Sequence, residues 1–361
     1  MKVGKHGKQE NKWKIGDMEI AETKKYKYLG DIITPDNKNT ENLRSRRGKL
    51  QGTTMIIRTI ASGEILHHIE TSVLLRLHES KGLSGLLNNC EAWNLSKKEE
   101  EELEKIEIQA IKHLFDLPLH TPTVAIIYSL GLLYTTQRVD KIQLIYLQKL
   151  LQKAQSEYAT RALKTLETKQ MGWYKKISDT LIKYNLPRDF DAIRTAPMAR
   201  WRNAVTAAIE VKNKSRILED LYKAEGETKT PKTKTKSIIE KVNVTSYTRK
   251  PEPEFLLMTK CETKSTLIAR YGMLDCGANF KGTMSSICVA CNMTDNEHHR
   301  LIECPKWQHL RDQIVSPTGV DFQDVYSGDI DKIRPILYNL DKIWNTKCAN
   351  GSMRKERNVD L

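Results

Sequence analysis

Three cysteines and one histidine near the C-terminal end of the sequence have the spacing of a zinc site. Cys288 and Cys291 are separated by two residues, His299 follows after seven more, and Cys304 after a further four. Zinc prefers four thiolate or imidazole ligands in a tetrahedron, and two short-spaced pairs joined by a small loop supply them. Because this set fills all four positions, the sequence predicts a structural zinc ion with no open position for a substrate.

One ligand of this set has a competitor. His298 stands next to His299, and His299 is favoured because it leaves the four-residue gap to Cys304 that zinc knuckles commonly have. The alternative is that buried cysteines and a histidine fell together by chance.

The remaining cysteines are scattered, at Cys90, Cys261, Cys276 and Cys348. Seven cysteines used in this way favour a reducing compartment with one metal site over a disulfide framework.

The overall charge favours a polyanionic partner. The 361 residues include 59 Lys and Arg against 45 Asp and Glu, which gives a formal net charge of +14. Neutralised phosphates release counterions, so a basic chain binds RNA or DNA more readily than an acidic one. The sequence has no apolar run of about 18 residues and no N-terminal stretch resembling a signal peptide. We therefore expect an intracellular protein, nuclear or cytoplasmic, that is neither secreted nor in a membrane.

Two groups of residues are candidates for nucleic-acid contacts. The first is a basic cluster, Arg44, Arg46, Arg47 and Lys49, which either contacts phosphates or forms a solvated helix face. The second lies beside the cysteines and consists of Lys306, Trp307 and Arg311. These three residues either stack on and pair with a strand, or Trp307 is the core residue of a small metal-bound module.

The elements that position these residues follow from local patterns. Gly16-Asp17 between two short apolar runs predicts a β-hairpin, and residues 26–33 predict a third strand. From Thr40 onward the period is helical. Ser96 and Glu99 form a capping box for a helix that Pro118 closes. Its apolar face is Leu103, Ile106, Ala110 and Leu114. The sequence therefore predicts a mainly α protein.

Several short motifs, in order, resemble those of non-LTR (LINE-like) retrotransposon reverse transcriptases. Over residues 1 to about 310 they are Lys27-Tyr28-Leu29-Gly30-Asp31, Asn88-Asn89-Cys90-Glu91-Ala92-Trp93, Leu117-Pro118-Leu119-His120-Thr121-Pro122, Arg270-Tyr271-Gly272-Met273, Asn279-Phe280-Lys281 and the cysteine cluster. The first is similar to the hairpin that follows the catalytic palm and grips the primer terminus. The next two resemble the helical thumb, and the rest resemble the segment that leads to the zinc knuckle.

The resemblance and the local patterns together predict a division of the chain into six parts. These are the end of the palm with the primer-grip hairpin (1–39), a helical thumb (40–155), a helical linker region (156–222), a flexible basic linker (223–260), the zinc-knuckle region (261–310) and a helical tail of unknown role (311–361). The resemblance also implies that Tyr26, Tyr28, Leu29 and Gly30 contact the primer, although Tyr26 and Tyr28 serve equally well to pack a strand face. The implied partners are an RNA or DNA template–primer and the palm and fingers of the same polyprotein.

The residues of polymerase catalysis are not carried over. The family's palm binds two Mg²⁺ through paired aspartates plus a third, and this sequence contains no Asp-Asp pair. Mg²⁺ is therefore expected only for a palm that precedes Met1, and this chain alone is predicted to be inactive, with no catalytic residue. The inferred role is to hold RNA or DNA for target-primed reverse transcription. The alternatives are an element-derived, non-enzymatic zinc-binding interaction protein and a decayed fragment without function.

Overall fold

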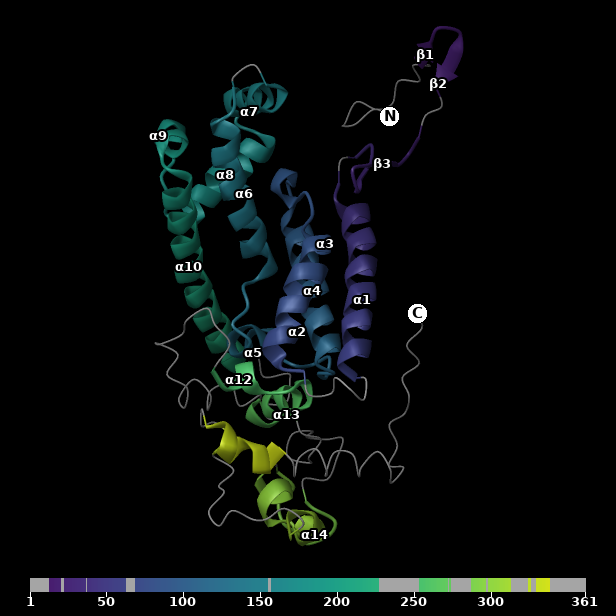
Figure 1. Ribbon diagram of the computed structural model, residues 1–361, viewed down its shortest axis with the longest axis vertical. Coiled ribbons are helices and arrows are strands. Elements are labelled where there is room, and N and C mark those ends of the chain that lie inside the picture. The colour runs from purple at the N-terminus through teal and green to yellow at the C-terminus, as the bar shows by residue number, and fades with distance from the viewer. Residues whose placement is uncertain are drawn as a thin grey trace. The chain divides into compact units, whose positions relative to one another are not determined.

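The computed structural model confirms a mainly helical protein (Figure 1). It describes residues 13–20, 23–36, 38–62, 69–154, 157–226, 253–271, 273, 287–296, 298–312, 324–325 and 329–337. These residues form two compact units that alternate along the chain. The first unit takes the described residues up to Thr59, then Arg76–Leu114 and Leu133–Lys214; the second takes Ile60–Leu75, Phe115–Leu132 and those from Ser215 onward.

Two separate β-hairpins begin the first unit. Strands β1 (Trp13–Ile15) and β2 (Met18–Ile20) pair across Gly16-Asp17, as predicted, and Gly16 has φ +59°. Strands β3 (Tyr26–Tyr28) and β4 (Asp31–Ile33) form the second hairpin. The prediction of one continuous strand over residues 26–33 was therefore wrong. Leu29 and Gly30 have φ +47° and +95° and reverse the chain, because a two-residue turn with positive φ at both positions matches the twist of paired strands.

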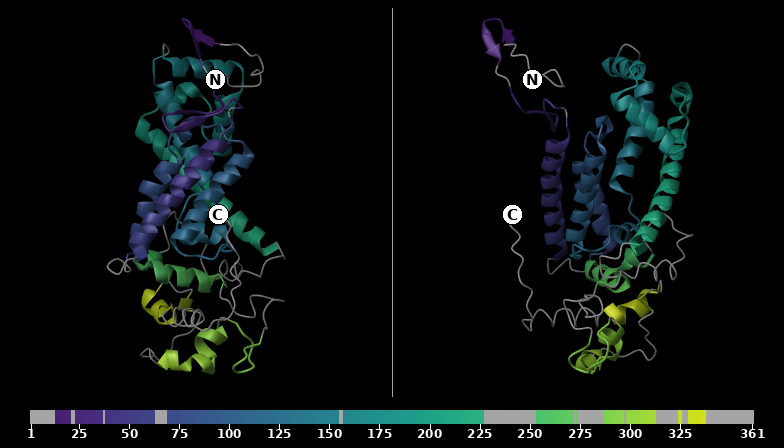
Figure 2. Two further views of the ribbon diagram at one scale, coloured as in Figure 1. Left: turned by 90° about the vertical axis from the view of Figure 1, so that its right-hand side faces the viewer. Right: turned by 180° about the vertical axis from the view of Figure 1, so that it is seen from behind.

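The helices after the second hairpin pack around a first apolar core. Helix α1 (Thr40–Ser62) lies alongside α4 (Lys97–Leu114), as the views of Figures 1 and 2 show. Between them in sequence are the π-helix η1 (His78–Leu83), the short α3 (Ser84–Leu86) and the 3₁₀ turn η2 (Cys90–Ala92). The core includes Leu43, Leu50, Leu86, Cys90, Trp93, Leu103 and Ile106. Each fully buried leucine contributes about 1.5–3 kcal/mol.

The predicted capping box and apolar face of α4 are confirmed. Glu99 accepts hydrogen bonds from the backbone N–H and the hydroxyl of Ser96, both at 2.8 Å, and its own N–H donates back to the Ser96 hydroxyl at 3.4 Å. The predicted apolar residues Leu103, Ile106, Ala110 and Leu114 are all buried. The local signals were sufficient here because both ends of the capping box lie within one helical turn.

A second apolar core in the same unit is built on α6 (Thr135–Leu151). Around it lie α7 (Tyr158–Thr168), α8 (Gly172–Lys183), α9 (Phe190–Thr195) and the start of α10 (Met198–Gly226). The Trp201 indole N–H donates to the carbonyl of Leu144 at 2.9 Å. The residues predicted as thumb and as linker region thus contribute to the same unit.

The second unit contains α5 (Thr123–Ser129), α12 (Pro253–Leu257) and α13 (Lys260–Arg270), together with most of α2 (Thr71–Leu77). Residues 330–337 are also helical. Arg270 forms a buried ion pair with Glu254 at 2.6 Å. The hydroxyls of Ser129 and Tyr271 lie 3.0 Å apart. The second of these contacts joins segments that are 142 residues apart in the sequence.

The predicted flexible linker at 223–260 needs a correction at both ends. Residues 223–226 finish α10, and 253–257 form α12 with Phe255 fully buried. Residues 227–252 lie outside the described residues. Helix α12 was not predicted because the linker, defined by its Lys- and Thr-rich stretch, was extended over Phe255 and Leu256. In the part of the chain that the structure describes, no helix is long and apolar enough to cross a membrane.

Candidate metal centre

The four predicted metal ligands converge in the structure. The sulfur atoms of Cys288 and Cys304 are 3.7 Å apart, and the sulfur of Cys291 lies 3.1 Å from Nε2 of His299. The ligand atoms of all four residues lie within 4.8 Å of one another. A zinc–sulfur distance of about 2.3 Å in a tetrahedron requires sulfur atoms roughly 3.8 Å apart. The donor set and its spacing therefore fit one metal ion.

A short hairpin-like loop carries the first two thiols. Ile287 and Thr294 form an antiparallel bridge, and the N–H of Cys288 donates to the carbonyl of Met293 at 2.8 Å. Within the loop the N–H of Asn292 donates to the carbonyl of Cys288 at 2.9 Å, and Asn292 has φ +57°. Asparagine tolerates this left-handed conformation better than most residues. The turn brings Cys288 and Cys291 to the same side of the loop.

A second turn supplies the other two ligands. The π-helix η4 (His299–Glu303) begins at His299, whose N–H donates to the side-chain oxygen of Asn296 at 2.8 Å. The N–H of Cys304 then donates to the carbonyl of His299 at 2.6 Å. π-Helical turns are rare and often occur at functional sites. This turn places Cys304 and the ring of His299 against the first thiol pair.

The structure separates the two neighbouring histidines. The side chain of His299 is 2% exposed and lies among the thiols. The side chain of His298 is 44% exposed, and its Nδ1 lies 3.1 Å from the carboxylate of Glu303. His299 is therefore the residue that belongs to the cluster. Glu303 also lies 3.7 Å from Nδ1 of His299, on the side where metal-bound histidines usually meet an acceptor.

The thiols have unequal acidities. Burial would raise the pKa of Cys288, but hydrogen bonds from His299, from the backbone at Ala290 and from the other two cysteines outweigh it and lower the pKa to about 7. Burial is the largest cause that raises the pKa of Cys304 to about 11, and the neighbouring Cys288 and Cys291 add to it. Three thiolates close together repel one another. A bound ion of charge +2 would offset this repulsion and allow all three thiols to ionise.

Around the ligands, polar and aromatic side chains hold the module together. Arg300 forms an ion pair with Asp295, and both side chains are largely buried.

Trp307, in the 3₁₀ turn η5 (Pro305–Trp307), is only 6% exposed, and Lys306 lies over its ring at 4.9 Å. Of the two roles considered for Trp307, the structure thus supports the core residue and not a stacking platform. Lys306 is exposed, and the side chain of Arg311 lies outside the described part.

Most of the predicted nucleic-acid residues of the first unit reach solvent. Tyr26, Tyr28 and Leu29 are 53%, 57% and 76% exposed, on β3 and its turn, and Gly30 forms the second half of that turn. On α1, Arg44, Arg47 and Lys49 are accessible. These residues are therefore placed where a nucleic acid can reach them.

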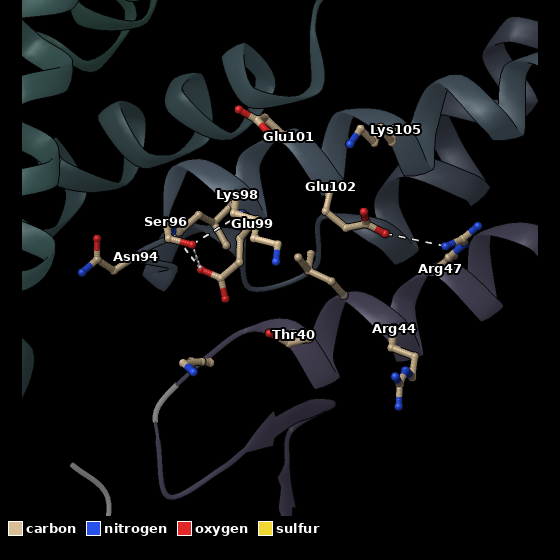
Figure 3. Close-up of a pocket in the computed structure, with 13 residues that line it drawn as sticks. Thr40, Arg44, Arg47, Asn94, Ser96, Lys98, Glu99, Glu101, Glu102 and Lys105 are labelled. Carbon is tan, nitrogen blue, oxygen red and sulfur yellow. Dashed lines mark hydrogen bonds and ion pairs between the residues drawn. The ribbon is translucent and has the colours of Figure 1, made fainter. Parts of the chain in front are cut away.

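A groove between α1 and α4 adjoins this surface. Its volume is about 810 Å³, and Figure 3 shows the residues that line it. Arg44 and Arg47 contribute from α1, and Lys98 and Lys105 from α4. Arg47 points toward Glu102 at 3.6 Å and donates to Gln109 at 3.0 Å. The groove thus has cations on both walls, partly balanced by carboxylates.

The predicted contact of Arg46 with nucleic acid was wrong. Its side chain is 3% exposed, forms an ion pair with Asp31, donates to the carbonyls of Gly85 and Leu86 at 3.2 Å, and lies 4.9 Å over the ring of Trp93. It is unavailable to a phosphate. The sequence carried a signal for this, because Arg46 follows the buried Leu43 by three residues and precedes the buried Leu50 by four.

No family model matches the chain, and neither a curated protein nor a solved structure matches it. The residues and their geometry are therefore the basis of the functional conclusion.

Proposed function

We propose that this chain is the nucleic-acid-holding, C-terminal part of a non-LTR retrotransposon reverse transcriptase, with a structural zinc knuckle. The observation that carries the proposal is the convergence of Cys288, Cys291, His299 and Cys304, at the place in the motif order where the resemblance expects a knuckle. The β3–β4 hairpin supports the proposal as well, because it contains the Lys27–Asp31 motif that resembles the primer grip.

The metal that suits this site best is zinc. Three thiols and an imidazole are soft or borderline ligands, which favour zinc over the oxygen-binding Mg²⁺ and Ca²⁺. All four positions are filled by protein, so zinc would have a structural role here. Metal binding in such small modules contributes about 10 kcal/mol to folding. That is enough to order a segment whose core has few apolar side chains besides Leu301 and Trp307.

The surface proposed to hold RNA or DNA consists of the exposed residues of the second hairpin and of α1. Arg44, Arg47 and Lys49 suit phosphate contacts, which position a nucleic acid without reading its sequence. Tyr26 and Tyr28 add exposed aromatic rings. No catalytic residue is proposed, because the sequence has no Asp-Asp pair. Mg²⁺-dependent nucleotidyl transfer would need the palm and fingers of the same polyprotein as partners.

The experiment compares two triple variants in binding a fluorescein-labelled DNA duplex with a recessed 3′ end. R44Q/R47Q/K49Q removes the proposed contacts. K164Q/K169Q/K175Q removes three exposed lysines from the region of α7 and α8. With about 0.5–1 kcal/mol for each exposed contact, the first variant is expected to bind between tenfold and a hundredfold more weakly. The control is expected to change affinity less than threefold. Equal losses of affinity in both variants would contradict the proposed surface, because they would mean that only the overall charge of the chain attracts DNA.

A second candidate function has one observation in its favour. The knuckle exposes apolar side chains: Ile287 is 51% exposed, Val289 95% and Met293 56%. Exposed apolar groups are typical of protein contact sites, so the knuckle of an element-derived interaction protein would have this surface. V289S separates the two functions, because it leaves the charge and hence nucleic-acid affinity unchanged while weakening a protein contact.

A further inference from the structure

The second hairpin is fastened to the helical core by a residue about 60 positions away in the sequence. The side-chain nitrogen of Asn89 donates to the carbonyl of Leu29 at 3.2 Å and to Oδ2 of Asp31 at 3.0 Å. Asn89 has φ +58° and stands directly before η2. One amide group therefore holds both sides of the turn at Leu29 and Gly30.

Helix α1 holds the same turn from another side. The other carboxylate oxygen of Asp31 pairs with Arg46, whose guanidinium also reaches the carbonyls of Gly85 and Leu86. One residue further along, the N–H of Ile32 donates to the side-chain oxygen of Asn42 at 2.5 Å. Both oxygens of Asp31 are thus engaged, each by a different part of the chain.

These contacts hold a hairpin whose first strand is largely exposed. An isolated two-stranded hairpin is marginal in water, and the side chains of Tyr26, Tyr28 and Leu29 are mostly exposed. The strands therefore gain little from apolar burial. The anchoring comes instead from the backbone of the turn and from Asp31, which leaves Tyr28 and Leu29 facing outward.

We propose that Asp31, Arg46 and Asn89 form a clamp of positioning residues that holds the Leu29–Gly30 turn ready to contact nucleic acid. The proposal rests on the proposed function and assigns a role to residues that need not touch the nucleic acid. A turn that is already ordered does not lose its freedom on binding, so affinity rises without any added contact. The clamp also joins the first two motifs of the resemblance, because Asp31 belongs to one and Asn89 to the other.

The members of the clamp differ in what their loss would do. Arg46 is buried, and removing Asp31 would leave its charge without that partner, which threatens the whole fold. Asn89 is half-buried, and its bond to Leu29 is exposed to solvent. Its replacement should free the turn while the helices stay folded. Asn89→Gly suits the test because glycine accepts the positive φ at this position.

The test measures amide hydrogen exchange and binding of the same recessed-end duplex in the full, zinc-loaded chain. In Asn89→Gly, exchange in β3 and β4 is expected to become about tenfold faster. Affinity is expected to fall three- to tenfold, with exchange in α4 and α6 unchanged. Asn88→Gly is the matched control, since Asn88 is exposed and, among the described residues, makes no hydrogen bond. It should leave both measurements near wild type.

A second variant guards against a general loss of folding. Asn89→Asp keeps the volume and the tolerance for positive φ, but places a carboxylate against that of Asp31, so it should loosen the turn further. Unchanged exchange in β3 and β4 in both Asn89 variants overturns the clamp, as does faster exchange with unchanged affinity. A wild-type chain that does not bind the duplex overturns the proposed function instead, and exchange then decides alone whether the clamp orders the turn.

Discussion

His298 and His299 are adjacent in the sequence, and only their surroundings distinguish them. Spacing to Cys304 favoured His299 without excluding its neighbour. In the structure the π-helical turn sends His299 inward to the thiols and leaves His298 beside Glu303 near the surface. The choice depends on a turn that ends in a hydrogen bond from Cys304 to His299, which residue types alone do not specify.

We therefore expect opposite results from two neighbouring substitutions. His299→Ala should lower zinc affinity by more than 100-fold, because losing a ligand costs more than the 10- to 100-fold typical of residues around one. His298→Ala should retain zinc within about threefold. Competition with a chromophoric chelator measures both affinities. If His298→Ala were the variant that lost zinc, the ligand assignment would be wrong.

Glu107 on α4 gives a pH prediction. Burial would raise its pKa, but nearby His78, the charge of Arg138 and a hydrogen bond from Thr135 outweigh burial, and the pKa lies below its ordinary value of 4.5. A carboxyl with a depressed pKa in the folded state stabilises the fold above its ordinary pKa. That stabilisation should disappear as the pH falls below about 4.5.

Urea denaturation from pH 7 to pH 3 tests this expectation. Wild type should be more stable than Glu107→Gln at pH 5, and this difference in unfolding free energy should shrink toward pH 3. Glu101→Gln removes an exposed carboxylate from the same helix and should show a smaller dependence on pH. A difference between wild type and Glu107→Gln that stays constant down to pH 3 would mean that Glu107 is not stabilised as a carboxylate.

At the scale of elements, the sequence predicted what depends on neighbouring residues and missed what depends on distant ones. The Ser96–Glu99 capping box and the buried face of α4 were both predicted correctly. The split of residues 26–33 into two strands was missed, since leucine at φ +47° is unfavourable by itself and the hydrogen bond to Leu29 comes from Asn89, 60 positions away. Arg46 was misassigned because the acidic partner of a buried arginine lies in another element.

The capping box should have a measurable effect on stability. Ser96→Ala removes the hydroxyl that caps the start of α4, and we expect a loss of about 1 kcal/mol in unfolding free energy. Ser72→Ala, at an exposed hydroxyl in the first turn of α2 that contacts Glu70, is the control and should cost less. Chemical denaturation of the three proteins decides the point, and equal stability of Ser96→Ala and wild type would contradict it.

At the scale of the whole molecule, segments that are separate in the sequence belong to the same compact unit. The sequence suggested six consecutive parts, whereas the described residues form two units, each assembled from separate segments. In the second unit, Lys260 pairs with Asp116 at 2.7 Å, and the hydroxyls of Thr71 and Thr263 lie 2.6 Å apart. Such pairings across more than a hundred residues leave no trace in local periodicity and therefore cannot be predicted from the sequence.

If the chain holds nucleic acid through phosphate contacts, as proposed, its affinity for nucleic acid must depend on salt. Affinity of the zinc-loaded chain for the recessed-end duplex would be measured from 50 to 300 mM salt. We predict a linear fall of log affinity against log salt, with a slope of about −0.9 for each phosphate contact, and a slope about three units shallower in R44Q/R47Q/K49Q. An affinity that does not depend on salt, or a slope that this variant leaves unchanged, would contradict this proposal.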